Sequence, residues 1–426
     1  MLQLTSTEQD MLDGKQGEAV ALAMRLITQL ARVKDATHLI DVKSVHIDGC
    51  IFYGQAGLDY ANKLVDLGAK VVVPTTVNVG SIDLIHPGRV LENTEREKEI
   101  ARGARDIMAA YAKMGVTQTW TCAPYQADVR PEFGTDIAWA ESNAIVFANS
   151  VLGARTDRYG DFMDIASAIT GKAPYAGLHL PENRIGHVIL DCSALSNRVA
   201  SLDITYPILG YLGGHYSETD NPVFIGLPAD SSEDQLKALG AAAASAGGVG
   251  LFHIVGRTPE APTLQSVVAD ATRLPTHIVD AEVLARTREH LCTAQSGTKL
   301  DAVSLGTPHA SFAEIQALRN ELADGEPLHP EVQVYINTGR TVLQQATEAG
   351  HIQELENAGI KIVADTCAYM TSIFLPGTKT VMTNSGKVAH YAPANMGVDI
   401  VLATLHECVE SARRGVVTLD SKLFHD

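Results

Sequence analysis

Helical and extended patterns alternate along nearly the whole chain, and this alternation restricts the possible folds more than any other sequence feature. Apolar residues recur at helical spacing over residues 5–30, 57–67, 94–114 and 138–151. Short apolar runs typical of strands lie at residues 38–46, 70–73, 117–121, 221–225, 249–254, 302–305, 332–336 and 361–364. Alternating helices and strands are typical of layered α/β domains, so we predict an α/β fold.

The chain is long enough for more than one domain. Its 426 residues correspond to two or three domains of about 100–200 residues each. Candidate boundaries lie near residues 195–207 and 260–275, the second in a stretch rich in Pro and Thr. We therefore predict an α/β domain over 1–200, a small α/β segment or domain over 201–275 and a further α/β domain over 276–426.

Charge and hydropathy exclude several functional classes. The formal net charge is -17 and no basic cluster stands out, which argues against binding to nucleic acid. No apolar run reaches the roughly 18 residues that a membrane-spanning helix needs, and no secretory signal is recognisable. The six cysteines form no CxxC pair, so we expect reduced thiols in a cytoplasmic protein.

Polar motifs follow many of the predicted strands. Ligands of open α/β sheets bind beyond the carboxyl ends of the strands, so these motifs are candidate site segments. They lie at residues 74–81, 121–126, 306–311, 337–340, 365–367 and 383–391.

Two cysteines lie in such motifs and are candidate metal ligands. Cys122 follows the strand that ends at Thr121, and Cys367 follows the strand that ends at Ala364. A single cysteine in such a position is more often a small buried hydrophobic residue, but two of them favour a metal site. Asp365 is a candidate hydrogen-bond acceptor behind the metal, or a cap of the following turn.

Other motifs supply groups for binding anions. Arg340 lies at a predicted helix start, where a cation is disfavoured unless an anion lies nearby, so we predict that it binds the substrate carboxylate; a surface arginine is the alternative. The turn containing Asn384, Ser385 and Lys387 offers backbone amides and an ammonium group for a carboxylate or phosphate. A solvated loop is the alternative interpretation of this turn.

Two further loops complete the set of candidate segments. Thr307 and His309 project polar groups from the third strand-end loop, next to a capping box formed by Ser311 and Glu314. Near the N-terminus, the candidate proton carriers are His46, Asp48 and Ser81, and the candidate for substrate binding is Asn78.

These motifs together resemble the aconitase X family, an outlying branch of the aconitase superfamily. The resemblance covers nearly the whole chain. It is most specific in the segments 43–49, 73–78, 122–125, 140–144, 148–156, 177–184 and 383–391.

The resemblance implies a fold, a partner and a cofactor. Aconitase-like large subunits are multi-domain α/β proteins whose strands end at a central cleft that holds an iron centre. The family's smaller swivelling domain is either fused or separate. For this chain the resemblance implies a separate small subunit that supplies a serine to the active site.

The resemblance also implies the reaction. Family members dehydrate cis-3-hydroxy-L-proline to pyrroline-2-carboxylate in bacteria, or mevalonate 5-phosphate in archaea, with iron as the Lewis acid. We expect the hydroxyproline reaction, because the additional cations needed for a phosphate are not evident. A non-catalytic RNA-binding or regulatory relative is the alternative from another class.

One position departs from the archaeal pattern. Its Gly-Cys-Pro-His loop reads Gly306-Thr307-Pro308-His309 here, so only Cys122 and Cys367 match the family's thiolates. A [4Fe–4S] cluster normally needs three thiolates. We therefore expect a [2Fe–2S] cluster or a single iron, with Cys50 as the candidate third ligand.

Overall fold

The structure is a computed structural model that describes residues 2–425. The chain divides into two compact units. Unit 1 contains the residues up to Ile82 together with Glu92–Arg184, and unit 2 contains Asp83–Leu91 together with the residues from Ile185 onward. Each unit is an α/β structure, which confirms the predicted fold class.

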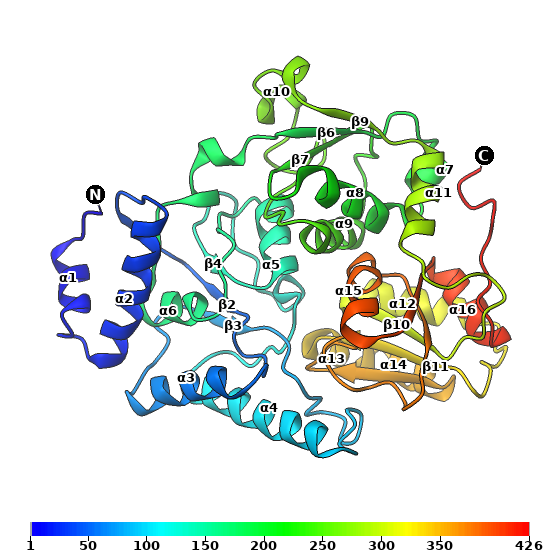
Figure 1. Ribbon diagram of the computed structural model, residues 1–426, viewed down its shortest axis with the longest axis horizontal. Coiled ribbons are helices and arrows are strands. Elements are labelled where there is room, and N and C mark those ends of the chain that lie inside the picture. The colour runs from blue at the N-terminus through cyan, green and yellow to red at the C-terminus, as the bar shows by residue number, and fades with distance from the viewer. Residues whose placement is uncertain (1, 426) are drawn as a thin grey trace. The chain divides into compact units, whose positions relative to one another are not determined.

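Unit 1 is built on short strands surrounded by helices (Figure 1). Its elements are α1 (Ser6–Leu12), α2 (Glu18–Val33), β1 (Leu39–Asp41), β2 (Val45–Ile47), α3 (Gln55–Asp66), β3 (Thr75–Val77), α4 (Glu95–Lys113), β4 (Ala138–Trp139), α5 (Ser142–Phe147), a π-helical turn (Ala148–Leu152), α6 (Met163–Thr170) and β5 (Lys172–Pro174).

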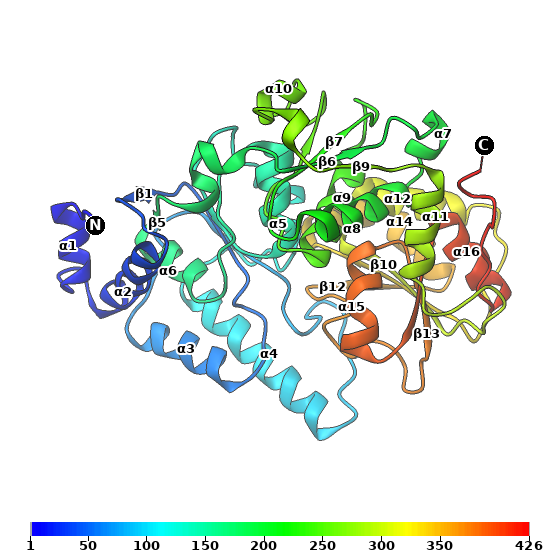
Figure 2. The ribbon, with the colours of Figure 1, turned by 45° about the horizontal axis from the view of Figure 1, so that its top comes forward.

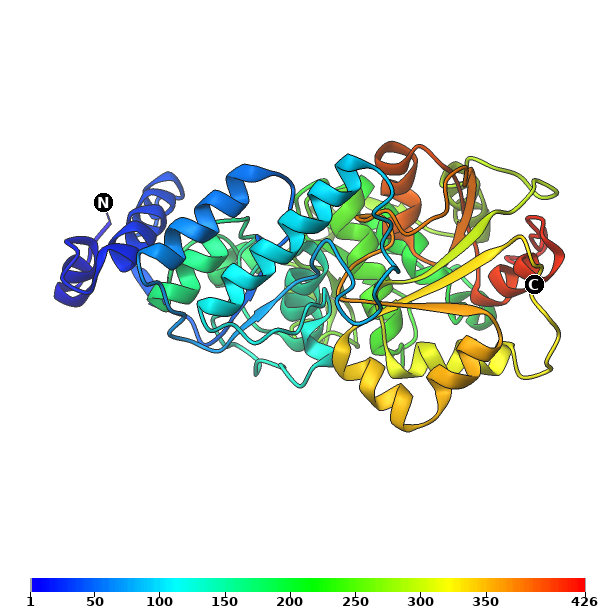
Figure 3. The same cartoon turned by 90° about the horizontal axis from the view of Figure 1, so that it is seen from below.

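A three-stranded parallel sheet forms the centre of unit 1, in the order β3-β2-β4. All three residues of β2 and of β3 are buried, as expected for parallel strands that helices cover on both faces. Helices α3 and α4 lie side by side, as Figure 3 shows from below. Capping boxes at Thr5 and Thr94 begin α1 and α4 and satisfy their first backbone N–H groups.

Several boundaries in unit 1 differ from the sequence prediction. The helix predicted over residues 5–30 is two helices, because the turn between them places Gly14 and Gly17 at φ 82° and 105°. The strand predicted at residues 70–73 is instead β3, which begins at Thr75. Residues 117–121 form only an isolated bridge, between Thr117 and Thr76. The helix predicted from residue 138 begins at Ser142, because Ala138 and Trp139 pair with β2.

Unit 2 contains two parallel sheets with helices packed on them (Figure 2). Its elements are β6 (Val188–Asp191), α7 (Asn197–Ala200), α8 (Thr205–Ser217), β7 (Pro222–Ile225), α9 (Glu233–Ala246), β8 (His253–Ile254), α10 (Leu264–Val267), β9 (Thr276–Ile278), α11 (Ala281–His290), β10 (Ala302–Ala310), α12 (Phe312–Glu321), β11 (Gln333–Thr338), α13 (Arg340–Glu348), α14 (His351–Asn357), β12 (Ile360–Ala364), β13 (Thr380–Thr383), α15 (Gly386–Met396), β14 (Asp399–Leu402) and α16 (Leu405–Arg414).

The five-stranded sheet of unit 2 has the order β12-β11-β10-β13-β14. The chain runs outward from β10 to β12 and then returns to the other side of β10 with β13. Ligands of such sheets bind at the carboxyl ends of the strands, at the point where the strand order reverses. The turns after β10 and β13 are therefore the expected ligand-binding segments of this sheet.

One face of this sheet packs against α12, α13, α14 and α16 in a continuous apolar core. Alternate strand residues point into this core, among them Val303 and Leu305 on β10 and Val334 and Ile336 on β11. Helix α15 contacts β10, β13 and β14, and it also packs on α9. In the described part of the chain, no helix combines the length and apolar character needed to cross a bilayer.

Close helix packing in unit 2 depends on Gly210. A Cβ atom at Gly210 on α8 would lie 2.1 Å from the carbonyl oxygen of Leu239 on α9. We expect Gly210→Ala to lower the free energy of unfolding by about 1–3 kcal/mol, because the two helices must separate. Urea unfolding monitored by circular dichroism measures this change.

The matched control is Gly57→Ala on α3, where the added Cβ would meet no atom closer than 3.8 Å. This variant should unfold at the same urea concentration as the parent chain or a higher one. Equal midpoints for Gly210→Ala and the parent chain would contradict the packing described here.

Candidate functional site

In unit 1, two polar residues follow neighbouring parallel strands. Asp48 comes directly after β2 and Asn78 directly after β3, which pair in the register Ile47 with Val77. The amide nitrogen of Asn78 donates to the carboxylate of Asp48 at 2.5 Å. The structure therefore brings together two residues that were predicted from separate motifs, at the carboxyl edge of the sheet.

His46 lies on β2 and is completely buried. Its Nδ1 lies 2.8 Å from the hydroxyl oxygen of Thr76, and that hydroxyl is 3.5 Å from the carbonyl oxygen of Val45, to which it donates. We assign the proton of the neutral ring to Nδ1, which then donates to the Thr76 hydroxyl. Nε2 then carries the lone pair, and within the described residues it has no hydrogen-bond partner.

The pKa of His46 is lowered and the pKa of Asp48 is raised, so both side chains are mostly uncharged near neutral pH. Burial lowers the pKa of His46 to about 4, so its imidazole is neutral at physiological pH. Burial, together with the negative charges of Glu141 and Asp161, raises the pKa of Asp48 to about 8. Asp48 is therefore mostly protonated near neutral pH, and the pair combines a carboxylic acid with a neutral imidazole.

Sequence reasoning missed Asp164, which holds the loop that carries Asp48. Its Oδ2 accepts from the backbone N–H groups of Asp48 and Gly49, at 2.8 and 2.9 Å. Asp164 is fully buried on α6, and burial raises its pKa to about 7. The available signal was an acidic residue within the otherwise apolar stretch Met163–Thr170.

Ser81 and Cys50 help to shape the same loop. Ser81 Oγ accepts from the backbone N–H of Phe52 at 3.1 Å. The Cys50 thiol is buried and donates to the carbonyl oxygen of Asn78 at 3.4 Å. Burial and the nearby Asp48 and other acids raise the pKa of Cys50 well above its ordinary value, which disfavours the thiolate that a metal ligand needs.

Cys122 lies in unit 1, in a buried turn, with a side chain that is 3% exposed. Asn143 on α5 donates to the carbonyl oxygen of Cys122 at 3.0 Å, and the Ala123 N–H donates to the Thr121 hydroxyl. These contacts fix the backbone of the turn on both sides of the thiol.

His309 and Cys367 come together in unit 2. Their potential ligand atoms lie within 4.8 Å of each other, and both side chains are buried. His309 Nε2 lies 3.1 Å from the carbonyl oxygen of Thr366, so Nε2–H donates and Nδ1 carries the lone pair. A nitrogen lone pair next to a thiol is a suitable donor set for iron or zinc. His309 was predicted only as a member of the loop, and its motif carried no further signal for a ligand.

Arg340 makes a two-pronged ion pair with Asp365. Its Nε and Nη2 lie 2.6 and 2.7 Å from the two carboxylate oxygens. Asp365 has φ 62°, an uncommon backbone conformation for a residue other than glycine, and lies two residues before Cys367. Arg340 was predicted to bind the substrate carboxylate, and in this structure two of its N–H groups bind Asp365 in the loop of Cys367.

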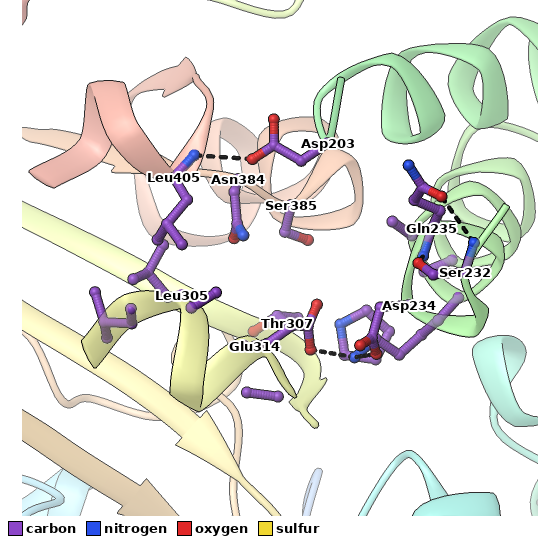
Figure 4. Close-up of a pocket in the computed structure, with 18 of the residues that line it drawn as sticks. Asp203, Ser232, Asp234, Gln235, Leu305, Thr307, Glu314, Asn384, Ser385 and Leu405 are labelled. Carbon is purple, nitrogen blue, oxygen red and sulfur yellow. Dashed lines mark hydrogen bonds and ion pairs between the residues drawn. The ribbon is translucent and has the colours of Figure 1, made fainter. Parts of the chain in front are cut away.

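A cavity of about 410 Å³ lies at the carboxyl ends of β10 and β13 in unit 2. Thr307, Asn384 and Ser385 line it, and Figure 4 shows Thr307 and Ser385 on facing sides. The Thr307 hydroxyl is buried, with no hydrogen-bond partner among the described residues. Lys387 is not among the lining residues; its ammonium group lies 5.9 Å from the centre of the Tyr369 ring.

Comparisons with known proteins identify the family. Models of the aconitase X first, second and third domains match residues 1–182, 186–289 and 300–414. The chain is 42% identical to a cis-3-hydroxy-L-proline dehydratase from Pseudomonas aeruginosa over 419 residues, which is 97% of this chain and 70% of that protein.

An archaeal relative and an archaeal crystal structure are also similar to this chain. It is 35% identical to the phosphomevalonate dehydratase large subunit of Thermococcus kodakarensis, over 91% of this chain and 94% of that protein. The crystal structure of Thermococcus kodakaraensis aconitase X in its holo-form superposes with a TM-score of 0.85 at 32% identity, covering 96% of this chain and all of that chain. The resemblance inferred from the motifs is thus confirmed: the chain belongs to the aconitase X family, whose similar members are dehydratases, that is, hydro-lyases.

Proposed function

We propose that the chain is the large subunit of a dehydratase that converts cis-3-hydroxy-L-proline to pyrroline-2-carboxylate. The observation that carries this proposal is the 42% identity to a protein of that activity over 97% of the chain. The charges that line the cavity of unit 2 favour the same substrate over mevalonate 5-phosphate. Four carboxylates and a single ammonium group line it, which disfavours a doubly charged phosphate: Asp203, Asp230, Asp234, Glu314 and Lys237.

We assign the metal centre to His309 and Cys367, whose potential ligand atoms lie within 4.8 Å of each other in unit 2, and to Cys122, which the motif after its strand marks as a ligand. Two thiolates and one imidazole suit a single iron or a [2Fe–2S] cluster better than a [4Fe–4S] cluster, which normally takes three thiolates. When bound, iron supplies a Lewis acid for the substrate hydroxyl. Cys50 is left out because its surroundings favour the protonated thiol.

His46 and Asp48 handle the protons in this proposal. Nε2 of neutral His46 accepts the proton from the carbon next to the substrate carboxylate, and protonated Asp48 donates to the departing hydroxyl group, which leaves as water. One proton is taken and one is given, so the site must return its proton from His46 to Asp48 before the next turnover. Asn78 orients Asp48 through their hydrogen bond, and Ser81 supports the loop.

The substrate carboxylate is assigned to the turn after β13. Asn384 and Ser385 line the cavity, and the N-terminus of α15 lies next to them. Lys387 contributes its positive charge to the same turn from a buried position. Arg340 is reassigned from the substrate to the loop of Cys367, because two of its N–H groups already bind Asp365.

A separate small subunit completes the enzyme in this proposal and supplies a serine to the active site. The similar archaeal proteins are named large subunits, which implies a small-subunit partner for them. We place the complex in the cytoplasm, where the six free cysteines stay reduced.

Substituting the proposed ligands should remove iron from the protein. We expect Cys122→Ser and Cys367→Ser to lose most of their iron after anaerobic reconstitution, because a serine hydroxyl is a harder and less ionised ligand. Metal analysis and the visible absorption spectrum measure the loss. Cys192→Ser, at a buried thiol outside the proposed centre, is the control and should keep its iron. Full iron content in both ligand variants would exclude this centre.

Asp48→Asn should lower the activity and change how the stability depends on pH. We expect kcat to fall by about 10²–10⁴-fold, because the proton donor is lost. The raised pKa of Asp48 means that folding favours its protonated form, so its contribution to stability falls as pH rises from about 4 to about 8. Asparagine does not titrate, so the variant does not lose stability in this way. The melting temperature of Asp48→Asn minus that of the parent chain should therefore rise over that pH range and stay constant above it.

Thermal unfolding between pH 4 and 9 measures this difference, with Asp66→Asn at the exposed end of α3 as the control. A melting-temperature difference for Asp48→Asn that does not change with pH would contradict the burial and charge described for Asp48.

The substrate is tested by assaying the reconstituted complex with both candidate compounds. We expect turnover of cis-3-hydroxy-L-proline with release of pyrroline-2-carboxylate, detected by mass spectrometry, and at least a hundredfold lower kcat/KM for mevalonate 5-phosphate. The carboxylates around the cavity are the physical reason for this preference. Preferential turnover of mevalonate 5-phosphate would instead place the chain with its archaeal relatives.

A further inference from the structure

Lys237 is a buried cation that the proposed mechanism does not use. It lies on α9, and its side chain is 2% exposed. Its ammonium group lies 3.0 Å from the carboxylate of Asp234 and makes a closer ion pair with Glu314 on α12. Burial alone lowers the pKa of Lys237, but the two carboxylates outweigh burial and raise that pKa above its usual value. Lys237 therefore stays charged.

The same ammonium group reaches the backbone of a proposed metal ligand. Lys237 Nζ donates to the carbonyl oxygen of His309 at 3.3 Å. Asp234 reinforces the contact from the same helix, because its Oδ2 accepts from the Ser311 hydroxyl at 2.7 Å. Glu314 in turn accepts from the Ser311 N–H at 2.8 Å as part of the capping box of α12. Helix α9 thus contacts this segment at three residues, which are His309, Ser311 and Glu314.

These contacts hold the backbone of His309 and not its imidazole. The ring is held by Thr366, next to Cys367, while the backbone is held by α9. Losing Lys237 would leave the carboxylates of Asp234 and Glu314 close together without a cation. The hydrogen bond from Lys237 to the His309 carbonyl would also be lost, so α9 would no longer hold the backbone of His309.

We propose that Lys237 is a positioning residue that holds His309 in the orientation needed to bind the metal. This inference rests on the proposed function, because that proposal assigns His309 to the metal centre. Contacts behind a metal ligand typically change metal affinity about 10–100-fold when they are removed.

The test measures binding of Co²⁺ to the anaerobic full-length chain, through the absorption band of thiolate-bound cobalt, in competition with a chelator. We expect Lys237→Met to weaken Co²⁺ binding about 10–100-fold and Lys237→Arg to restore most of it, because arginine keeps the cation. The double variant Lys237→Met/Glu314→Gln should show the same loss, because it also lacks the ammonium group that binds the His309 carbonyl, and it leaves only one carboxylate, that of Asp234, without its cation. It keeps the test valid if the single variant does not fold, because glutamine preserves the capping box.

Arg288→Met is the matched control. Arg288 forms a comparably buried ion pair with Glu407, at 2.6 Å, in the same unit, and its guanidinium also donates to a backbone carbonyl, that of Leu402. This variant should lose stability but keep the Co²⁺ affinity of the parent chain.

Each outcome has a separate meaning. Parent-like affinity in the double variant, or an equal loss in Arg288→Met, would overturn the positioning role of Lys237. Absence of a thiolate–cobalt band in the parent chain would instead overturn the proposed metal centre itself, so the two failures are distinguishable.

Discussion

Parallel strand pairing is the constraint on which the proposed chemistry depends. In unit 1, the register of β2 with β3 places Asp48 beside Asn78, thirty residues away in sequence. In unit 2, the parallel pairing of β10, β11 and β12 brings His309 to the loop after β12, where its ring reaches Thr366. A one-residue slip in either sheet would turn these side chains to the opposite face. The contacts of Asp48 with Asn78 and of His309 with Thr366 would then be lost.

Buried ionisable groups contact the loops at these strand ends, and each one is held by specific contacts. Asp164 receives two backbone N–H groups, Asp365 receives a two-pronged guanidinium, and Lys237 bridges two carboxylates. Burial of a charge is costly unless such partners are present. The same burial that costs stability brings the pKa of Asp48 close to neutrality, which suits the proton donor that we propose.

The α/β class, most strand positions and the polar segments after the strands could be predicted from the sequence, because apolar periodicity and strand-end turns are local signals. Local signals did not locate β3, since residues 70–73 are as apolar as a strand and only sheet pairing selects Thr75–Val77. Cys122 and Cys367 were recognised as candidate ligands from their position after strands and from the family resemblance. His309 was recognised only as part of a loop. Its contact with Thr366 depends on the parallel pairing of β10, β11 and β12, which no local pattern encodes. Arg340 was predicted to bind the substrate carboxylate, and the sequence could not show that Asp365 is its partner in this structure.

The proposed chemistry requires that thiolates and one imidazole from loops far apart in the sequence bind iron together. X-ray absorption spectroscopy of the anaerobically purified complex at the iron edge reports these ligands. We expect a first coordination shell that contains sulfur together with histidine nitrogen. An iron shell made only of oxygen and nitrogen, without sulfur, would contradict this expectation.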